Sequence, residues 1–258
     1  MGIDLKKMRN KLNKLNTKGG SGNRSIFWRP SEGDQTIRIV PVADGDPFKE
    51  FWFHYNLGNN AGFLSPKRNF GEPDPLNDFV QQLYNEGTED SIKMAKNLSA
   101  RQRFFSPVIV RGEEEKGVRV WGYGKTVYEQ LLSLVLNPEY GDITDMDAGT
   151  DLQLQYGKPA GAAYPVTRIT PSRKTSTVCQ DISPEECADL LEQVPDFDSL
   201  FDRKTPEQVG QMLDAYLAGE DAESVSNETQ KYGGGDTTTT TTTTTSSTVE
   251  NAFNELLS

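Results

Sequence analysis

The sequence predicts an α+β protein with a mainly β core, followed by a helical and acidic C-terminal part. Three observations point to this class. Stretches typical of strands occur at 26–70 and again at 101–170. Apolar residues with helical spacing lie between these two blocks and after residue 183. Residues 219–258 are low in complexity, which is typical of a linker rather than of a packed core.

The first block contains two clear strand candidates. The stretch "QTIRIVPV" (35–42) alternates, with Ile37 and Ile39 on one face and Arg38 on the other. The stretch "KEFWFHYNL" (49–57) is aromatic and follows an Asp-Gly-Asp-Pro turn. Residues 73–100 then change to a helical period and predict a helical insertion of two helices separated by Gly87. Its apolar residues are Leu76, Phe79, Val80, Leu83, Ile92, Met94, Ala95 and Leu98.

The second block opens with "RQRFFSPVIVRGEEEKGVRVWGYGK" (101–125), which predicts two strands joined by a charged turn at 112–117. Each strand mixes apolar, aromatic and basic residues. A helix is expected at 126–136. The remaining expected elements are strands at 152–156 and 163–170 and a basic loop, "PSRKTST", at 171–177.

Residues 183–218 contain two sequence signatures of a helix N-terminus. Ser183-Pro184-Glu185-Glu186 and Thr205-Pro206-Glu207-Gln208 each place a capping residue before a proline and acidic residues. The chain ends in an acidic, threonine-rich tail (219–258) that is expected to be disordered. Its tip, "VENAFNELLS", carries Phe253, Leu256 and Leu257, and composition leaves open whether it docks on a partner or is a frayed terminus.

Charge is distributed unevenly along the chain. The formal net charge is −11, yet residues 1–30 carry eight basic residues and one acidic residue. Residues 183–258 carry three basic and sixteen acidic residues. Such asymmetry predicts an anionic partner, nucleic acid above all, together with an acidic tail.

The basic end has the pattern of a short amphipathic helix. Leu5, Met8, Leu12 and Leu15 recur at spacings of three and four, and a glycine-rich stretch at 18–22 follows. Residues 1–22 are therefore expected to form a flexible arm. Its helical pattern includes the cations Lys6, Lys7, Arg9, Lys11 and Lys14, and Lys18 follows them.

The sequence lacks the residues or motifs that several classes of protein require. Cys179, Cys187 and His54 are too few and too scattered for a zinc site or a disulfide framework, so both cysteines are expected to be reduced and partly buried. No catalytic motif is recognisable, and an enzyme is not expected. The longest mostly apolar run, 131–136, cannot span a bilayer, and no secretory signal is evident, so a soluble intracellular protein is expected.

The basic and aromatic residues of the strands point to single-stranded nucleic acid. Such binding needs cations along the phosphates and flat rings on which unpaired bases stack. The alternative is that the rings form the core and the arginines are merely solvated. The expected phosphate contacts are Arg101, Arg103, Arg111, Arg119, Lys125, Arg168, Arg173 and Lys174. The expected stacking rings are Trp121, Tyr123, one of Phe104 and Phe105, and Tyr55 or Phe70.

The order of these parts resembles the single-stranded-DNA-binding (helix-destabilising) protein of T-even-type bacteriophages. The likeness covers most of the chain. It rests on the basic start, "TIRIVPV", the aromatic strand with His54, the helical insertion and the acidic tail. It also rests on "RQRFFSPVIVRGEEE" leading into "GVRVWGYGKTVYEQL".

The resemblance implies an OB-fold, a five-stranded Greek-key barrel, in residues 23–218. It implies cooperative coating of single-stranded DNA in phage replication, recombination and repair, in the cytoplasm of the infected bacterium. The arm would contact the next bound molecule, and the tail would recruit replication and recombination proteins. No membrane partner is expected.

The sequence departs from this family in two places. Many members hold zinc with one His and three Cys in the insertion, but residues 60–100 contain no cysteine, so no zinc is expected and helix packing must stabilise the insertion instead. The arm carries "LKKMRNKL" in place of the family's compact basic Ser/Thr motif.

Two other classes remain as alternatives. One is a protein–protein adaptor without nucleic-acid binding. The other is a peripheral membrane protein that uses the arm, although the arm has no Trp or Phe to anchor it.

Overall fold

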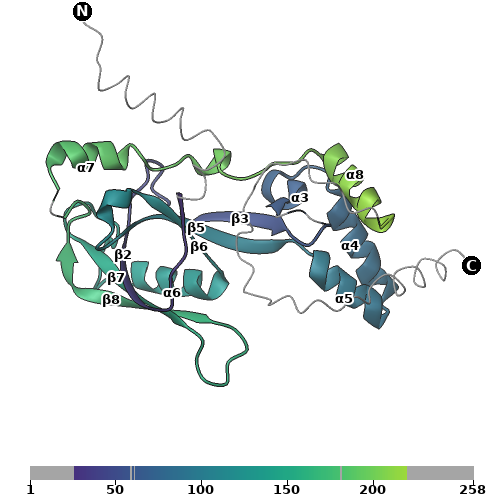
Figure 1. Cartoon of the computed structure of the whole chain (residues 1–258), viewed down its shortest axis with the longest axis horizontal. Helices are drawn as coiled ribbons and strands as arrows, with labels where there is room; N and C mark the ends of the chain where they lie inside the picture. Colours follow the sequence, from purple (N-terminus) through teal and green to yellow (C-terminus); the bar gives the residue numbers. More distant parts are fainter. Residues whose placement is uncertain (1–25, 59, 61, 181, 220–258) are drawn as a thin grey trace, which may run out of the picture.

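The computed structural model describes residues 26–58, 60, 62–180 and 182–219 (Figure 1). The five arm cations and the three apolar residues of the tail tip lie outside these residues. Within the described chain, no helix combines the length and the apolar composition needed to cross a membrane.

Eight strands form one mixed sheet with the order β1-β6-β5-β2-β7-β8; β3 pairs with β5 off this path, and β4 pairs with β3. All pairs are antiparallel except β1 with β6. The strands are β1 (Phe27–Trp28), β2 (Gly33–Ile39), β3 (Lys49–His54), β4 (Phe63–Leu64), β5 (Arg101–Val110), β6 (Arg119–Tyr123), β7 (Gly149–Gly157) and β8 (Val166–Ser176).

The helices begin where the sequence supplies a cap. Ser183 and Thr205 each form a complete capping box, and Asp74 and Thr88 accept a backbone N–H from the first turn that follows them. The helices are α3 (Pro66–Phe70), α4 (Pro75–Glu86), α5 (Glu89–Leu98), α6 (Lys125–Val135), α7 (Pro184–Leu191) and α8 (Pro206–Leu217). Two short 3-10 turns are η1 (Glu114–Lys116) and η2 (Phe197–Ser199).

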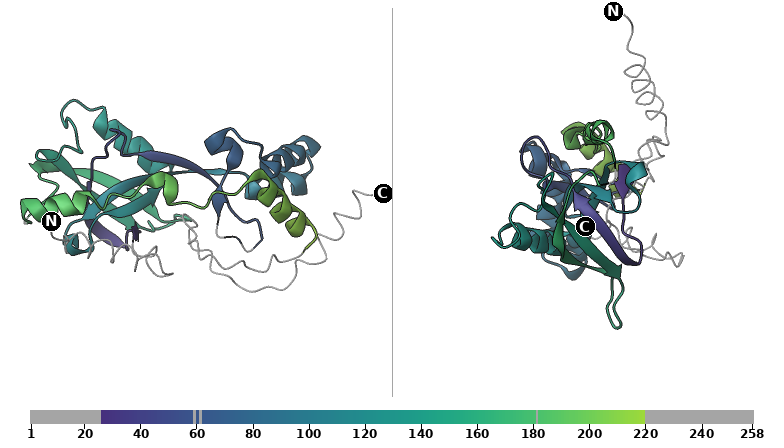
Figure 2. Two further views of the ribbon diagram at one scale, coloured as in Figure 1. Left: turned by 90° about the horizontal axis from the view of Figure 1, so that it is seen from above. Right: turned by 90° about the vertical axis from the view of Figure 1, so that its left-hand side faces the viewer.

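The molecule is elongated, and its two ends differ (Figures 1 and 2). Helices α3, α4, α5 and α8 gather at one end, whereas β2, β7, β8, α6 and α7 lie at the other. Strands β3 and β5 run between the two ends (Figure 1). These two strands therefore connect the main part of the sheet with the end of the molecule that contains the four helices.

Buried apolar side chains form separate clusters on the two faces of the central strands. One cluster fills the space between the curved sheet and α6 and contains Phe104 and Trp121. Another covers the opposite face of β3 and β5 and contains Phe105 and Phe197. A third cluster holds α4, α5 and α8 together through Leu76, Leu83 and other apolar residues. The expected helical packing of the insertion is therefore confirmed.

The structure confirms an α+β protein and is compatible with an OB-like core. Its sheet has eight strands rather than the expected five. The expected basic loop at 171–177 was wrong, because β8 continues through Ser176 and pairs with β7 as far as Gly149. A break in pairing between Thr150 and Leu152 lets the strand continue past Pro171.

The expected reduced state of the two cysteines is also wrong, since Cys179 and Cys187 form a disulfide with a Cα–Cα distance of 5.6 Å. Helix α7 folds back on the end of β8, where Leu190 and Val178 share a buried cluster. This packing brings together two cysteines that sequence spacing alone could not pair.

Candidate nucleic-acid interface

Strands β3 and β5 place aromatic and basic side chains on one face. Their antiparallel register pairs Phe51 with Arg103 and Phe53 with Arg101. Residues that lie directly opposite in such a pair point to the same side of the sheet. Phe51 and Phe53 are buried beneath this face, while Arg101 is exposed and Arg103 is partly exposed.

Tyr55 completes this face. Its ring stacks on Phe53 at a centroid distance of 5.8 Å and an interplanar angle of 24°. Burial raises the pKa of the Tyr55 hydroxyl, while the charges of Arg103, Arg101 and Arg29 and a hydrogen bond with Arg103 act against this rise. Three arginines are thus among the charged groups that act on Tyr55. Within the described chain, Arg101 forms no ion pair.

Gly62 allows the Tyr55 ring to lie where it does. A Cβ built on Gly62 would come within 2.7 Å of two Tyr55 ring carbons, and its φ of 122° is rarely adopted by residues with side chains. The ring is therefore held between Phe53 and the backbone of Gly62. This packing fixes an aromatic ring beside Phe53 on the face that carries Arg101 and Arg103.

Helix α3 carries Phe70 and packs beside Trp52 of β3, which alternates with Phe51 and Phe53 and so points to the opposite face of the strand. Asn69 fixes the helix to the strand, because its amide donates to the Trp52 carbonyl at 2.7 Å and its oxygen accepts the Trp52 N–H at 2.9 Å. The Arg68 guanidinium lies over the Trp52 ring at 5.1 Å, and that of Arg203 over the Phe70 ring at 4.0 Å. Phe70 is 39% exposed, and Trp52 is partly exposed.

The other aromatic residues expected to stack on bases are buried. Phe104, Phe105 and Trp121 are each 1% exposed, and Tyr123 is 6% exposed. Tyr123 shares a 2.7 Å hydrogen bond with Ser106, and burial raises the pKa of its hydroxyl. The two faces of β5 are both covered, so alternation brings neither Phe104 nor Phe105 to the surface. In this structure the four rings are core residues that support β5 and β6.

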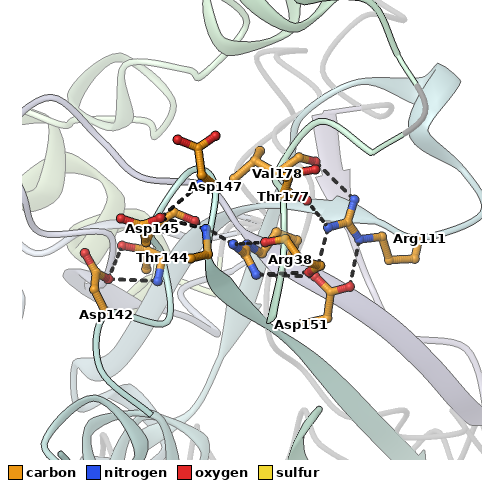
Figure 3. Close-up of polar contacts among 11 residues, drawn as sticks. Arg38, Arg111, Asp142, Thr144, Asp145, Asp147, Asp151, Thr177 and Val178 are labelled. Carbon is orange, nitrogen blue, oxygen red and sulfur yellow. Dashed lines mark hydrogen bonds and ion pairs between the residues drawn. The ribbon is translucent and has the colours of Figure 1, made fainter. Parts of the chain in front are cut away.

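Two of the expected phosphate contacts are held by carboxylates. Arg111 donates to Asp151 from Nε at 3.1 Å and from Nη2 at 2.9 Å (Figure 3). It also donates to the carbonyls of Val178 and Thr177. Arg119 is 7% exposed and pairs with Glu113 at 2.5 Å. These contacts identify both arginines as structural in the observed state.

Arg38 belongs to the same network as Arg111, which the alternation of "QTIRIVPV" did not indicate. It is fully buried and donates from Nη2 to the carbonyls of Asp145 at 2.6 Å and Ser176 at 2.9 Å (Figure 3). Burial lowers its pKa, and the nearby Asp151 carboxylate, 3.5 Å away, favours its charged form. The arginine thereby joins β2 to the end of β8.

The remaining expected cations lie on other parts of the surface. Arg168, Arg173 and Lys174 are exposed on β8, at the edge of the sheet, and Lys125 is exposed at the start of α6. Two strands, β2 and β7, separate β8 from β5, a distance of roughly 14 Å at the usual strand spacing. The structure therefore separates the cations of β5, Arg101 and Arg103, from those of β8 at the edge of the sheet.

Sequence reasoning missed part of the β3–β5 surface. Arg29, Trp52, Arg68 and Arg203 come from four separate segments, and only the aromatic composition of 49–57 hinted at Trp52. Tyr164, 72% exposed in the loop between β7 and β8, was missed as well.

A comparison with family models decides the relationship of the chain. Residues 31–214 match the model described as gp32 DNA binding protein like. The chain belongs to this gp32-like family of DNA-binding proteins. The match covers the sheet and the helices almost completely. A search of curated proteins found no matching relative.

The gp32-like resemblance raised the question of a zinc site at His54, and the residues present do not fit one. His54 is fully buried, with Nε2 at 3.0 Å from Asp74 and Nδ1 at 3.1 Å from the Leu98 carbonyl. Within the described residues, no three His, Cys, Asp or Glu side chains are grouped to hold a metal.

Asp74 is the buried polar partner of His54. Burial by itself raises the pKa of Asp74, but hydrogen bonds from His54, Ser65 and the Asn77 N–H and the charge of His54 lower it to about 2. Asp74 is therefore ionised and accepts hydrogen bonds from its neighbours. The second ring nitrogen of His54, Nδ1, lies against the Leu98 carbonyl. A buried His54–Asp74 pair thus joins β3 to the insertion of this gp32-like chain.

Proposed function

We propose that the protein binds single-stranded DNA without sequence preference on the β3–β5 surface, defined as Arg29, Trp52, Tyr55, Arg68, Phe70, Arg101, Arg103 and Arg203. The observation that carries this proposal is that Arg101 and Arg103 lie on the face of β3 and β5 where the Tyr55 ring stacks on Phe53. Guanidinium groups pair with phosphates, and an unpaired base can stack on a flat ring. Membership of a DNA-binding family supports the same ligand.

Rings favour single strands over duplex DNA because paired bases keep their faces stacked inside the helix. Tyr55, Trp52 and Phe70 offer faces or edges at the surface, each beside an arginine. The exposed β8 cations Arg168, Arg173 and Lys174 are proposed as outer contacts to the same strand. Arg111, Arg119, Lys125 and the four buried rings are not used in this proposal.

The wider role follows the family resemblance. The protein is proposed to coat single strands cooperatively during phage replication, recombination and repair, inside the infected bacterium. Neighbouring molecules would join through the basic arm. Replication and recombination proteins would be recruited through the tail tip around Phe253, Leu256 and Leu257.

The test compares single substitutions on the β3–β5 surface with a matched change elsewhere. Arg101→Ala removes one exposed cation, and Lys93→Ala removes an exposed cation from α5. Affinity for a thymidine oligomer is measured over a range of salt concentrations. Losing one phosphate contact should reduce the slope of log affinity against log salt by about 0.7, and only Arg101→Ala should do so.

Tyr55→Leu tests stacking separately. Leucine can still pack on Phe53 but offers no ring to a base. Base stacking contributes roughly 1–3 kcal/mol, so affinity should fall about tenfold with little change in the salt slope. If Arg101→Ala and Tyr55→Leu both bind as the unchanged protein does, the proposed surface is wrong. If the unchanged protein binds no DNA at low salt, the adaptor alternative is favoured.

A further inference from the structure

An apolar groove with acidic residues lies between the turn after β2 and the segment after α7. Its volume is about 670 Å³. Apolar side chains from both segments and Met146 form most of its lining. They are Pro41, Val42, Ala43, Met146, Leu191, Val194, Pro195 and Phe197. The proposed DNA surface does not use this groove.

The groove carries uncompensated negative charge. Asp44 and Lys49 line it and form an ion pair, so they offset each other. Asp196 and Asp198 also line it, both are exposed, and within the described chain neither forms an ion pair. The occupant that fits is therefore an apolar segment flanked by cations.

Two apolar segments of this chain lie outside the described residues, and their charges distinguish them. The tail tip contains Glu250 and Glu255 and no cation, so the groove would repel it. Residues 3–15 place Leu5, Met8, Leu12 and Leu15 at helical spacing among five cations and one acid. Only this basic arm matches both the apolar lining and the charge.

The described chain also begins close to the groove. Phe197, which lines the groove, lies in the buried cluster against which Ile26 and Phe27 pack. Residues 16–25 can span up to roughly 33 Å when extended, enough for residues 3–15 to reach the groove of the same molecule. A short tether gives such a segment an effective concentration in the millimolar range.

We infer that the groove holds residues 3–15 of the same chain when the protein is free of DNA. Docked in this way, the arm is unavailable to a neighbouring molecule, and the free protein stays monomeric. This consequence rests on the proposed role of the arm in joining neighbours. The docking itself can be measured without DNA.

Photo-crosslinking of the full chain locates the arm directly. The photoreactive residue p-benzoylphenylalanine replaces Leu12. The protein is mixed with a heavy-isotope copy, irradiated without DNA and then analysed by mass spectrometry. Crosslinks within one chain to 41–44, 146 or 191–198 are expected. Crosslinks between light and heavy chains, or to other regions, would overturn the inference.

Trypsin supplies an independent readout, because the arm contains six cleavage sites at Lys and Arg. The variant Asp196→Asn with Asp198→Asn keeps a capping side chain for η2 and removes both charges. Removing both exposed charges should make arm cleavage about fivefold faster at low salt, which corresponds to about 1 kcal/mol for the two together. Glu89→Gln with Asp90→Asn, at the start of α5, is the matched control and should leave the rate unchanged.

Three results decide the matter. Faster cleavage in the groove variant alone, at a rate independent of protein concentration, supports docking in the same chain. Equal rates in all three proteins contradict it, and so does protection that grows with protein concentration, which indicates docking between molecules. Affinity for a short thymidine oligomer, measured on the same proteins, shows separately whether the proposed DNA binding holds.

Discussion

Replacing Asp74 by alanine should destabilise the protein more than any other single carboxylate change on α4. The side chain of Asp74 is fully buried and meets three donors. It accepts from His54 Nε2 at 3.0 Å, from the Ser65 hydroxyl at 2.6 Å and from the Asn77 N–H at 3.1 Å. Alanine leaves all three without their acceptor.

The magnitude follows from these contacts. Loss of a helix cap costs about 1 kcal/mol. Removing one partner of a buried ion pair costs about 3–5 kcal/mol. We expect the free energy of unfolding to fall by about 3–5 kcal/mol, which corresponds to a Tm roughly 10 °C lower for a chain of this size.

The assay is urea unfolding followed by circular dichroism, with Asp78→Ala as the control. Asp78 lies on the same helix, but its pair with Lys67 is exposed at both ends, so its loss should cost less than about 1 kcal/mol. Asp74→Asn keeps the cap and should fall between the two. Equal stabilities of Asp74→Ala and Asp78→Ala would refute the buried ion pair.

Three further predictions concern stability. The pKa of Asp74 is lowered from 3.8 to about 2, so its ionised form stabilises the folded protein fully above pH 4, and this stabilisation is lost as the pH falls toward 2. In an acid titration, the free energy of unfolding of Asp74→Asn should therefore fall by roughly 2–3 kcal/mol less than that of the unchanged protein. Gly149→Ala should cost about 2 kcal/mol in thermal unfolding, since its Cβ would come within 2.2 Å of Arg38, whereas Gly210→Ala in α8 should gain up to about 1 kcal/mol. Breaking the Cys179–Cys187 disulfide with Cys187→Ser should cost about 2–3 kcal/mol in oxidised protein, and a reductant should abolish the difference.

Local patterns predicted the elements well. The two capping signatures at Ser183 and Thr205 start α7 and α8 as expected, and "KEFWFHYNL" contains β3. These features depend on neighbours a few residues away, which the sequence displays directly. The helices of the insertion were predictable for the same reason.

The candidate site was predicted only in part, because exposure depends on distant segments. Tyr55, Arg101 and Arg103 were expected and lie together, but Arg29 joins them from a segment more than twenty residues away in sequence. Phe105 is covered by Phe201, which follows η2, at a centroid distance of 4.6 Å. No pattern within "RQRFFSPVIV" indicates that covering.

The central claim is single-strand binding on the β3–β5 surface, and tryptophan fluorescence tests it most directly. Trp28 and Trp121 are buried, at 7% and 1% exposure, whereas Trp52 lies on the proposed surface. Titration with single-stranded DNA should quench the emission, Trp52→Phe should remove most of the quenching, and affinity should fall steeply with salt. Equal quenching by duplex DNA, or none by single strands at low salt, would contradict the account.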